Sequence, residues 1–186
     1  MQYVQLFEQF IFENSGNHKY GCAMLYFDFP QLKKLQEEIE PEDIYEEEDD
    51  SSYGIEKDPH CTLLYGFWKS VCPLKVRDVV NSHEIGKCTV HKISKFENEK
   101  YDVLKFEVKN PVLHEINKEL AEFPHTNKFK DYKPHATVAY LKPGKADKYI
   151  KKWKGKSFDL DPKKLVYSEV TGEKKHYKIK HEEASS

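Results

Sequence analysis

The sequence lacks several features that would each point to a particular class of protein. It has no apolar run of about 18 residues, which excludes a transmembrane helix and a membrane partner. Residues 1–13 have no basic start and no small-residue cleavage site, so we expect no secretory signal. The four cysteines form no Cys-x-x-Cys pair and no cluster with histidine, which argues against structural zinc and a disulfide framework. These absences favour the reducing environment of the cytoplasm.

Arginine is almost absent, and charge is unevenly distributed. Of the 30 basic residues every one except Arg77 is lysine, and the 32 acidic residues leave a net charge of -2. Residues 1–93 carry 9 basic and 17 acidic side chains, whereas residues 94–186 carry 21 basic and 15 acidic ones. The second half favours an anionic substrate, while the first half would repel a long polyanion such as duplex DNA.

The length of 186 residues suits a single domain, 1–186. Hydrophobic periodicity predicts strands at 21–29, 61–65, 86–96, 100–109, 135–141, 165–171 and 176–179, and helices at 31–40, 73–82, 111–123 and 145–153. Because this order has no regular βαβ rhythm, we predict an α+β fold with mostly antiparallel sheet. The acidic segment 37–52 is expected to be a mobile loop, and residues 181–186 a flexible tail.

A repeated motif is the most informative feature. Residues 59–65 and 134–140 both follow the pattern Pro-His-x-Thr-x-x-Tyr, with the two copies 75 residues apart. Alternate side chains share one face of a strand, so His60 and Thr62 should point one way while Cys61, Leu63 and Tyr65 point the other. In the second copy His135 and Thr137 should share a face, with Val138 and Tyr140 opposite.

Side by side, two such strands would bring two imidazoles and two hydroxyls to one point, an arrangement that suits a phosphodiester. One neutral histidine can accept a proton from the attacking group, and the other, protonated, can donate one to the leaving oxygen. Each threonine can donate a hydrogen bond to a non-bridging phosphate oxygen. The sequence therefore predicts His60, Thr62, His135 and Thr137 as catalytic residues, with no metal and no cofactor.

The two motifs resemble those of the 2H phosphoesterase superfamily, with firm identity confined to residues 58–66 and 132–144. The resemblance implies an antiparallel, bilobal fold with two pseudo-symmetric lobes around a central groove. It also implies a metal-free reaction on nucleotide phosphodiesters, carried by the histidine and threonine of each motif.

Residues 54–66 and 132–144 are more narrowly similar to phage anti-CBASS phosphodiesterases. That resemblance implies cleavage of 3′-5′ linkages in a cyclic di- or trinucleotide signal, in the host cytoplasm, as a counter-defence against host immunity. The ribose 2′-hydroxyl would then attack its own 3′-phosphate and open the ring.

Substrate contacts beyond the motifs are predicted at four residues. Tyr20 and Trp68 are candidate stacking platforms for a base, although core packing is the other interpretation of Trp68. Trp153, among lysines, could lie on the surface against a phosphate backbone, and Glu169 could accept a hydrogen bond from a base edge.

Three alternatives stay open at this stage. The same chemistry could act on linear RNA ends, 2′,3′-cyclic phosphates or 2′,5′-oligonucleotides. The groove could bind a nucleotide without turnover. The lysines of residues 142–156 could bind a short RNA, although ordinary amphipathic spacing favours a solvated helix face there.

Overall fold

The computed structural model describes residues 19–126 and 131–180. Eight strands and four α-helices are found in this part of the chain. In chain order they are β1 (Gly21–Phe27), α2 (Pro30–Glu38), the 3-10 turn η1 (Pro41–Asp43), β2 (His60–Phe67), α3 (Pro73–Asn81), β3 (Cys88–Glu97), β4 (Asp102–Lys109), α4 (Pro111–Leu120), β5 (His135–Leu141), α5 (Asp147–Trp153), β6 (Phe158–Leu160), β7 (Pro162–Ser168) and β8 (Lys174–Lys178).

Proline begins three of these helices, at Pro30, Pro73 and Pro111. Proline suits the first helical position because its fixed φ matches the helix and its missing N–H has no partner there. Before Pro111, Asn110 caps α4 by accepting a hydrogen bond from the backbone N–H of Val112 at 2.9 Å. These local signals explain why the predicted and observed helix starts agree.

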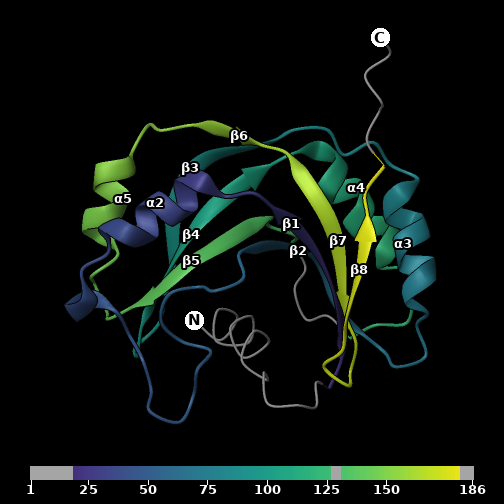
Figure 1. The fold of residues 1–186 in the computed structure, drawn as a ribbon, viewed down its shortest axis with the longest axis horizontal. Coiled ribbons are helices and arrows are strands. Elements are labelled where there is room, and N and C mark those ends of the chain that lie inside the picture. Colours follow the sequence, from purple (N-terminus) through teal and green to yellow (C-terminus); the bar gives the residue numbers. More distant parts are fainter. Residues whose placement is uncertain (1–18, 127–130, 181–186) are drawn as a thin grey trace.

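All strands belong to one curled antiparallel sheet, in the order β6-β3-β4-β5-β2-β1-β7-β8 (Figure 1). Its centre is the pair β2–β5, the two strands that carry the repeated motif. A single registered pair, Cys61 opposite Ala136, joins them, whereas β1 and β2 or β4 and β5 share six registered pairs each. The sheet therefore consists of two four-stranded halves that meet at the motif strands.

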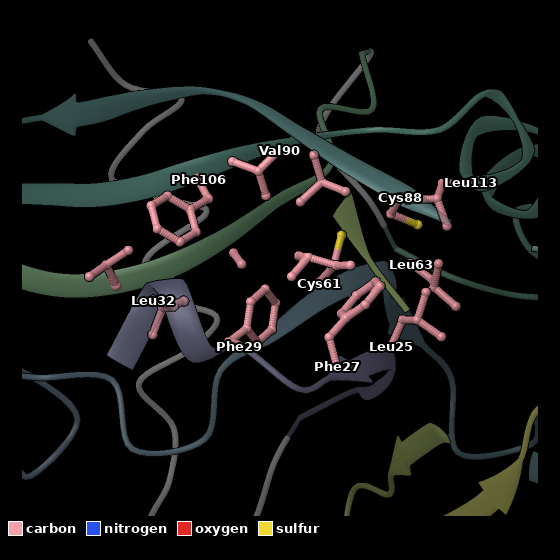
Figure 2. Close-up of a cluster of buried hydrophobic side chains, with 14 of the residues drawn as sticks. Leu25, Phe27, Phe29, Leu32, Cys61, Leu63, Cys88, Val90, Phe106 and Leu113 are labelled. Carbon is pink, nitrogen blue, oxygen red and sulfur yellow. The ribbon is translucent and has the colours of Figure 1, made fainter. Parts of the chain in front are cut away.

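The helices pack on one face of this sheet. The buried side chains of all four belong to the same cluster as the inward-facing strand residues, including Leu32, Val76, Leu113 and Trp153. Cys61 points from β2 into this core, close to Phe29 and Leu63 in Figure 2. The core thus holds the motif strands on the helix-covered face of the sheet. The side chains that alternate with Cys61 lie on the opposite face.

The observed architecture confirms the α+β class and the antiparallel sheet. The strand β6 was not expected, because three residues of mixed polarity give no periodicity. The four cysteines are free, as their spacing indicated. Within the described ranges no helix is long and apolar enough to cross a membrane. The expected tail at 181–186 lies outside the described residues.

The acidic segment 37–52 makes several contacts with the rest of the fold, and its mobility stays a prediction. Its first residues belong to α2 and η1. Beyond them, the N–H of Tyr45 donates to the carbonyl of Tyr140 at 2.9 Å, and Lys142 N–H donates to the carbonyl of Asp43 at 2.8 Å. The Asp43 carboxylate is buried, where it accepts a hydrogen bond from the Tyr149 hydroxyl and pairs with Lys148. Charge composition alone did not indicate these contacts.

Candidate active site

The register of β2 and β5 brings the two His-x-Thr segments together. Cys61 and Ala136 face each other and are both fully buried in the core. The residues on either side of them therefore project from the other face of the sheet, which we call the motif face. In an antiparallel pair this register sets His60 opposite Thr137 and Thr62 opposite His135. Each imidazole thus has the hydroxyl of the other motif as its cross-strand neighbour.

The same backbone hydrogen bond orients both imidazoles. Nδ1 of His60 lies 2.7 Å from the carbonyl oxygen of Asp58, and Nδ1 of His135 lies 2.9 Å from that of Lys133. A carbonyl oxygen only accepts, so each Nδ1 carries the proton that it donates. In the neutral ring Nε2 then holds the lone pair, which makes Nε2 the atom that can take up or release a proton in each motif.

His60 is flanked by a tyrosine and a carboxylate. The Tyr26 ring meets the imidazole edge-on at 5.5 Å, and its hydroxyl donates to Oδ2 of Asp58 at 2.7 Å. Lys174 donates to the same oxygen at 3.2 Å. Burial would raise the pKa of Asp58, but these two hydrogen bonds outweigh it and lower that pKa. Asp58 therefore stays ionised and holds Tyr26 against the His60 ring.

His135 is more deeply buried, with 8% of its surface exposed. Phe96 meets its ring edge-on at 5.2 Å. Burial lowers the pKa of His135 to about 4, and the charges of Lys105 and His60 act in the same direction. His135 is therefore a neutral imidazole near pH 7.

A buried lysine on β4 is a site residue that the sequence analysis missed. Lys105 is directly opposite Thr137 and is only 5% exposed. Its ammonium donates to the Ser94 hydroxyl at 2.6 Å, lies 3.7 Å from Glu107, and sits 4.3 Å from the centre of the Phe96 ring. Burial lowers the pKa of Lys105, with Glu107 opposing. A cation therefore lies beside one motif hydroxyl, where a phosphate would need charge neutralisation.

Two bulges change the orientation expected for the motif tyrosines. The register of β2 skips Leu63, so that Tyr65 faces Cys22 and not the core. The register of β5 skips Val138 at the same motif position, and Tyr140 faces Val103. An extra residue reverses the alternation beyond it, which moves both tyrosines onto the motif face. The prediction that they point into the core was wrong, and the bulge explains the spacing between threonine and tyrosine.

Apolar clusters border the motif residues on both sides. One contains Met24, Tyr26 and Val166 from β1 and β7. The other contains Tyr101, Val103 and Tyr140, with Phe96 packed against them together with Tyr45 and Tyr53, which lie between η1 and β2. The polar His-x-Thr residues therefore lie between two aromatic flanks, which suits a ligand with both a charged group and flat rings.

The four further contact candidates lie away from this centre. Tyr20 touches Tyr65 at 6.0 Å, and Trp68 follows the last residue of β2, about 26 Å along the strand from His60. Trp68 is 51% exposed and donates to the Thr126 hydroxyl at 3.0 Å, so core packing does not describe it. Glu169 follows β7 and pairs with Lys175 at 3.2 Å.

Trp153 is placed differently from its prediction. It is 3% exposed, stacks near Phe106 and donates to Glu38 at 3.0 Å. It packs in the core, on the face opposite the motifs, because α5 turns its apolar stripe toward β3. A surface contact between Trp153 and a phosphate backbone is therefore ruled out by this fold. The indole instead packs on the core side while Lys156 lies 4.1 Å above its ring.

Comparison with solved structures gives a likeness of fold. No family model matches the chain, and no curated protein matches it. It is similar to a solved structure described as a crystal structure of a phosphoesterase, with 10% identity and a TM-score of 0.46 over 87% of this chain and 96% of that one. At this level the likeness carries no argument about activity, so the function is argued from the residues of the motif face. Among the described residues no group of three or more His, Cys, Asp or Glu side chains could hold a metal ion.

Proposed function

We propose that the protein is a phosphodiesterase that cleaves nucleotide linkages with two histidines and no metal. The observation that carries the proposal is the antiparallel pairing of the two motif strands, which sets each histidine opposite the threonine of the other motif. Acid–base cleavage of a phosphodiester needs one proton acceptor, one proton donor and hydrogen bonds to the non-bridging oxygens. The four motif side chains supply these groups on one face of the sheet, at the junction of two sheet halves that would form the lobes of a groove.

The neutral ring of His135 is the base in this mechanism. Its Nε2 takes the proton of the ribose 2′-hydroxyl, and the 2′-oxygen forms a bond to the neighbouring phosphorus. The bond from phosphorus to the 5′-oxygen breaks, and Nε2–H of protonated His60 gives its proton to that oxygen. The products are a 2′,3′-cyclic phosphate and a 5′-hydroxyl, with all protons accounted for.

Thr62, Thr137 and Lys105 would act on the phosphate itself. Their donors would face the non-bridging oxygens, on which negative charge grows as the 2′-oxygen attacks. In a buried site such interactions are stronger than in water, and Lys105 is held in place by Ser94 before substrate arrives. The base, acid and oxyanion partners are thus assigned to five side chains.

We propose further that the substrate is a cyclic oligonucleotide signal and that its cleavage is a phage counter-defence. The support for this finer assignment is the resemblance of residues 54–66 and 132–144 to phage anti-CBASS phosphodiesterases. The aromatic flanks of the motif face add support, because bases stack on aromatic rings.

The decisive experiment is a cleavage assay with purified protein and a substrate panel. The panel contains cyclic di- and trinucleotides, linear RNA, 2′,5′-linked oligonucleotides and 2′,3′-cyclic nucleotides, each with excess EDTA. Wild-type protein should open a ring in the presence of EDTA, whereas His60→Ala and His135→Ala should each remove most turnover. The double variant should be little worse than either single one, because the two rings act as a unit.

His91→Ala is the matched control, since His91 is exposed on β3 and belongs to neither motif. Cleavage of only linear or 2′,5′-linked substrates would contradict the cyclic substrate and retain the chemistry. Tight binding without any cleavage would contradict the enzyme and identify a nucleotide-binding module. Activity lost on chelation and restored by a metal ion would refute the two-histidine mechanism.

A further inference from the structure

One row of side chains crosses the sheet, from His60 on β2 to Lys178 on β8. Tyr26 of β1 faces His60 on one side and Lys164 of β7 on the other, and Lys164 in turn faces Lys178 of β8. Residues directly opposite each other project from the same face, so all four lie on the motif face. With about 4.8 Å between strands, Lys164 lies about 10 Å and Lys178 about 14 Å from His60.

The contacts along the row show that it is continuous. The Tyr26 ring packs edge-on against His60 at 5.5 Å, and the Lys164 ammonium lies 5.3 Å from the centre of the Tyr26 ring. Among the described strands β8 is the last of the sheet, because it pairs with β7 and with no other described strand. The two exposed lysines, which we call the lysine row, therefore extend the motif face from the candidate site to the last described strand.

Charge differs between the two sides of the motif pair. On the His135 side, Glu107 lies 3.7 Å from Lys105 and 3.9 Å from Lys92, so these two cations share a carboxylate partner. On the His60 side, no carboxylate of residues 19–126 or 131–180 lies within 4 Å of the Lys164 or Lys178 ammonium. The nearby Asp58 is occupied by Tyr26 and Lys174. The two ammonium groups of the lysine row thus have no carboxylate partner among the described residues.

We propose that the lysine row binds the phosphates that follow the scissile one, an inference that rests on the proposed function. The substrate is then an oligonucleotide with at least three phosphates, the scissile one and one for each lysine, lying across β1, β7 and β8. A mononucleotide cyclic phosphate or a dinucleotide is too short to reach Lys178. Two cations in line with the acid–base pair complement a strand of regularly spaced negative charges.

Protection of a sheet edge is the ordinary reason for lysines on a terminal strand. It can account for Lys178 on β8, but it does not account for Lys164, which lies on β7, an internal strand paired on both sides. On β8, Lys175 is opposite Tyr167, whose side chain lies in the helix-side core, so Lys175 projects from the opposite face, where it pairs with Glu169. Lys175 has the same charge as Lys178 and lies on the same strand, so it is a matched control for Lys178.

The test is a binding titration that does not depend on turnover. The probe is a fluorescent 2′-O-methyl hexauridylate, which has no free 2′-hydroxyl to attack, and its affinity is measured by anisotropy from about 50 to 200 mM salt. Removing two phosphate contacts should lower the slope of log K against log salt by about 1.4, at about 0.7 per contact with a single strand. The double variant Lys164→Gln/Lys178→Gln should show this change and a reduced preference for the hexamer over uridylyl-uridine.

The single variant Lys178→Gln should lower the slope by about 0.7, whereas the matched control Lys175→Gln should keep the wild-type slope and preference. Equal losses in Lys178→Gln and Lys175→Gln would overturn the proposal, because the effect would then come from general surface charge. No loss in the double variant Lys164→Gln/Lys178→Gln would overturn it as well. Its failure is distinct from failure of the proposed function. If His60→Ala abolishes cleavage while the lysine row variant binds as wild type, the proposed function stands and this inference falls. If no phosphodiester is cleaved while the lysine row alone changes the slope, the row remains a binding site on a non-catalytic protein.

Discussion

Burial of His135 should make the protein sensitive to acid in a way that one substitution can remove. In the folded chain burial lowers the pKa of His135 to about 4, whereas an unfolded chain titrates histidine at about 6.5. Between these values the unfolded state binds more protons, so protonation favours unfolding. The stability that a neutral His135 allows is fully present above about pH 6.5 and is lost progressively as the pH falls from there to about 4.

The size of the effect follows from the two pKa values. At 1.36 kcal/mol per pKa unit, complete protonation of His135 should cost about 3 kcal/mol of unfolding free energy. By pH 5, where the unfolded histidine is already charged, the loss should be about 2 kcal/mol. This is a large share of the 5–15 kcal/mol typical of a folded domain, so it should be measurable.

Urea unfolding of wild-type protein and His135→Asn between pH 7 and 5 measures this effect. The asparagine amide can donate to the Lys133 carbonyl, as Nδ1 does at 2.9 Å, but it does not titrate. Carboxylates such as Asp58 titrate in both proteins and cancel in the difference. The wild-type protein should lose about 2 kcal/mol more than the variant by pH 5, and the His135 imidazole should titrate by NMR with a midpoint near pH 4.

Parallel loss of stability in the two proteins would refute the reasoning, as would an NMR midpoint near 6.5. The His135 ring would then be hydrated in the folded state. Its assignment as the base that is neutral across the physiological range would lose its physical basis.

Three other outcomes are expected. Thr62→Ala and Thr137→Ala should each reduce turnover by about a hundred- to a thousandfold, because each removes one hydrogen-bond donor to the charged phosphate. The serine variants keep the hydroxyl and should be far milder. If serine were as damaging as alanine, packing of the threonine methyl group would explain the loss instead. Lys105→Met should lower turnover about ten- to a hundredfold. Its stability in urea unfolding should be equal to that of the wild type or higher, because a buried charge is replaced by an apolar chain of similar volume. A loss of stability would mark Lys105 as structural. Gly66→Ala should lower the unfolding free energy by about 1–3 kcal/mol or more, because the φ of Gly66 is +106° and a Cβ there would clash with the carbonyl oxygen of Thr126. Gly144→Ala is the control and should cost less, because Gly144 has a φ of +80° but open space around it.

Much of the local structure was predictable from sequence patterns. The strand 135–141 was predicted with its observed bounds, and the helices that begin at Pro73 and Pro111 were predicted at their first residue. Proline at a helix start and apolar periodicity act within a few residues, so the chain carries them wherever the segment packs. The repeated Pro-His-x-Thr-x-x-Tyr pattern was likewise visible without a structure, because it depends on residue order alone.

The faces of the strands were only partly predictable. Strict alternation placed His60 and Thr62 correctly on one face, but it placed Tyr65 and Tyr140 on the wrong one. A bulge is set by pairing with the neighbouring strands, here β1 and β4, and it leaves no mark in the periodicity of strands as short as β2 and β5. The predicted side-chain direction is therefore correct up to the threonine of each motif and wrong after the bulge at Leu63 or Val138, which pairing with the neighbouring strand sets.

The four motif side chains could be identified from residue order alone, whereas Lys105 and the way in which all five side chains meet depend on the tertiary fold. Pairing β2 with β5 brings together segments 75 residues apart, and no local rule selects that neighbour from the other strands. Burial was also decided by packing, which enclosed Trp153 and Lys105 and left Trp68 exposed. Side-chain type gives only a preference for burial. What lies against a residue, and therefore its exposure and its pKa, depends on distant parts of the chain that fold onto it.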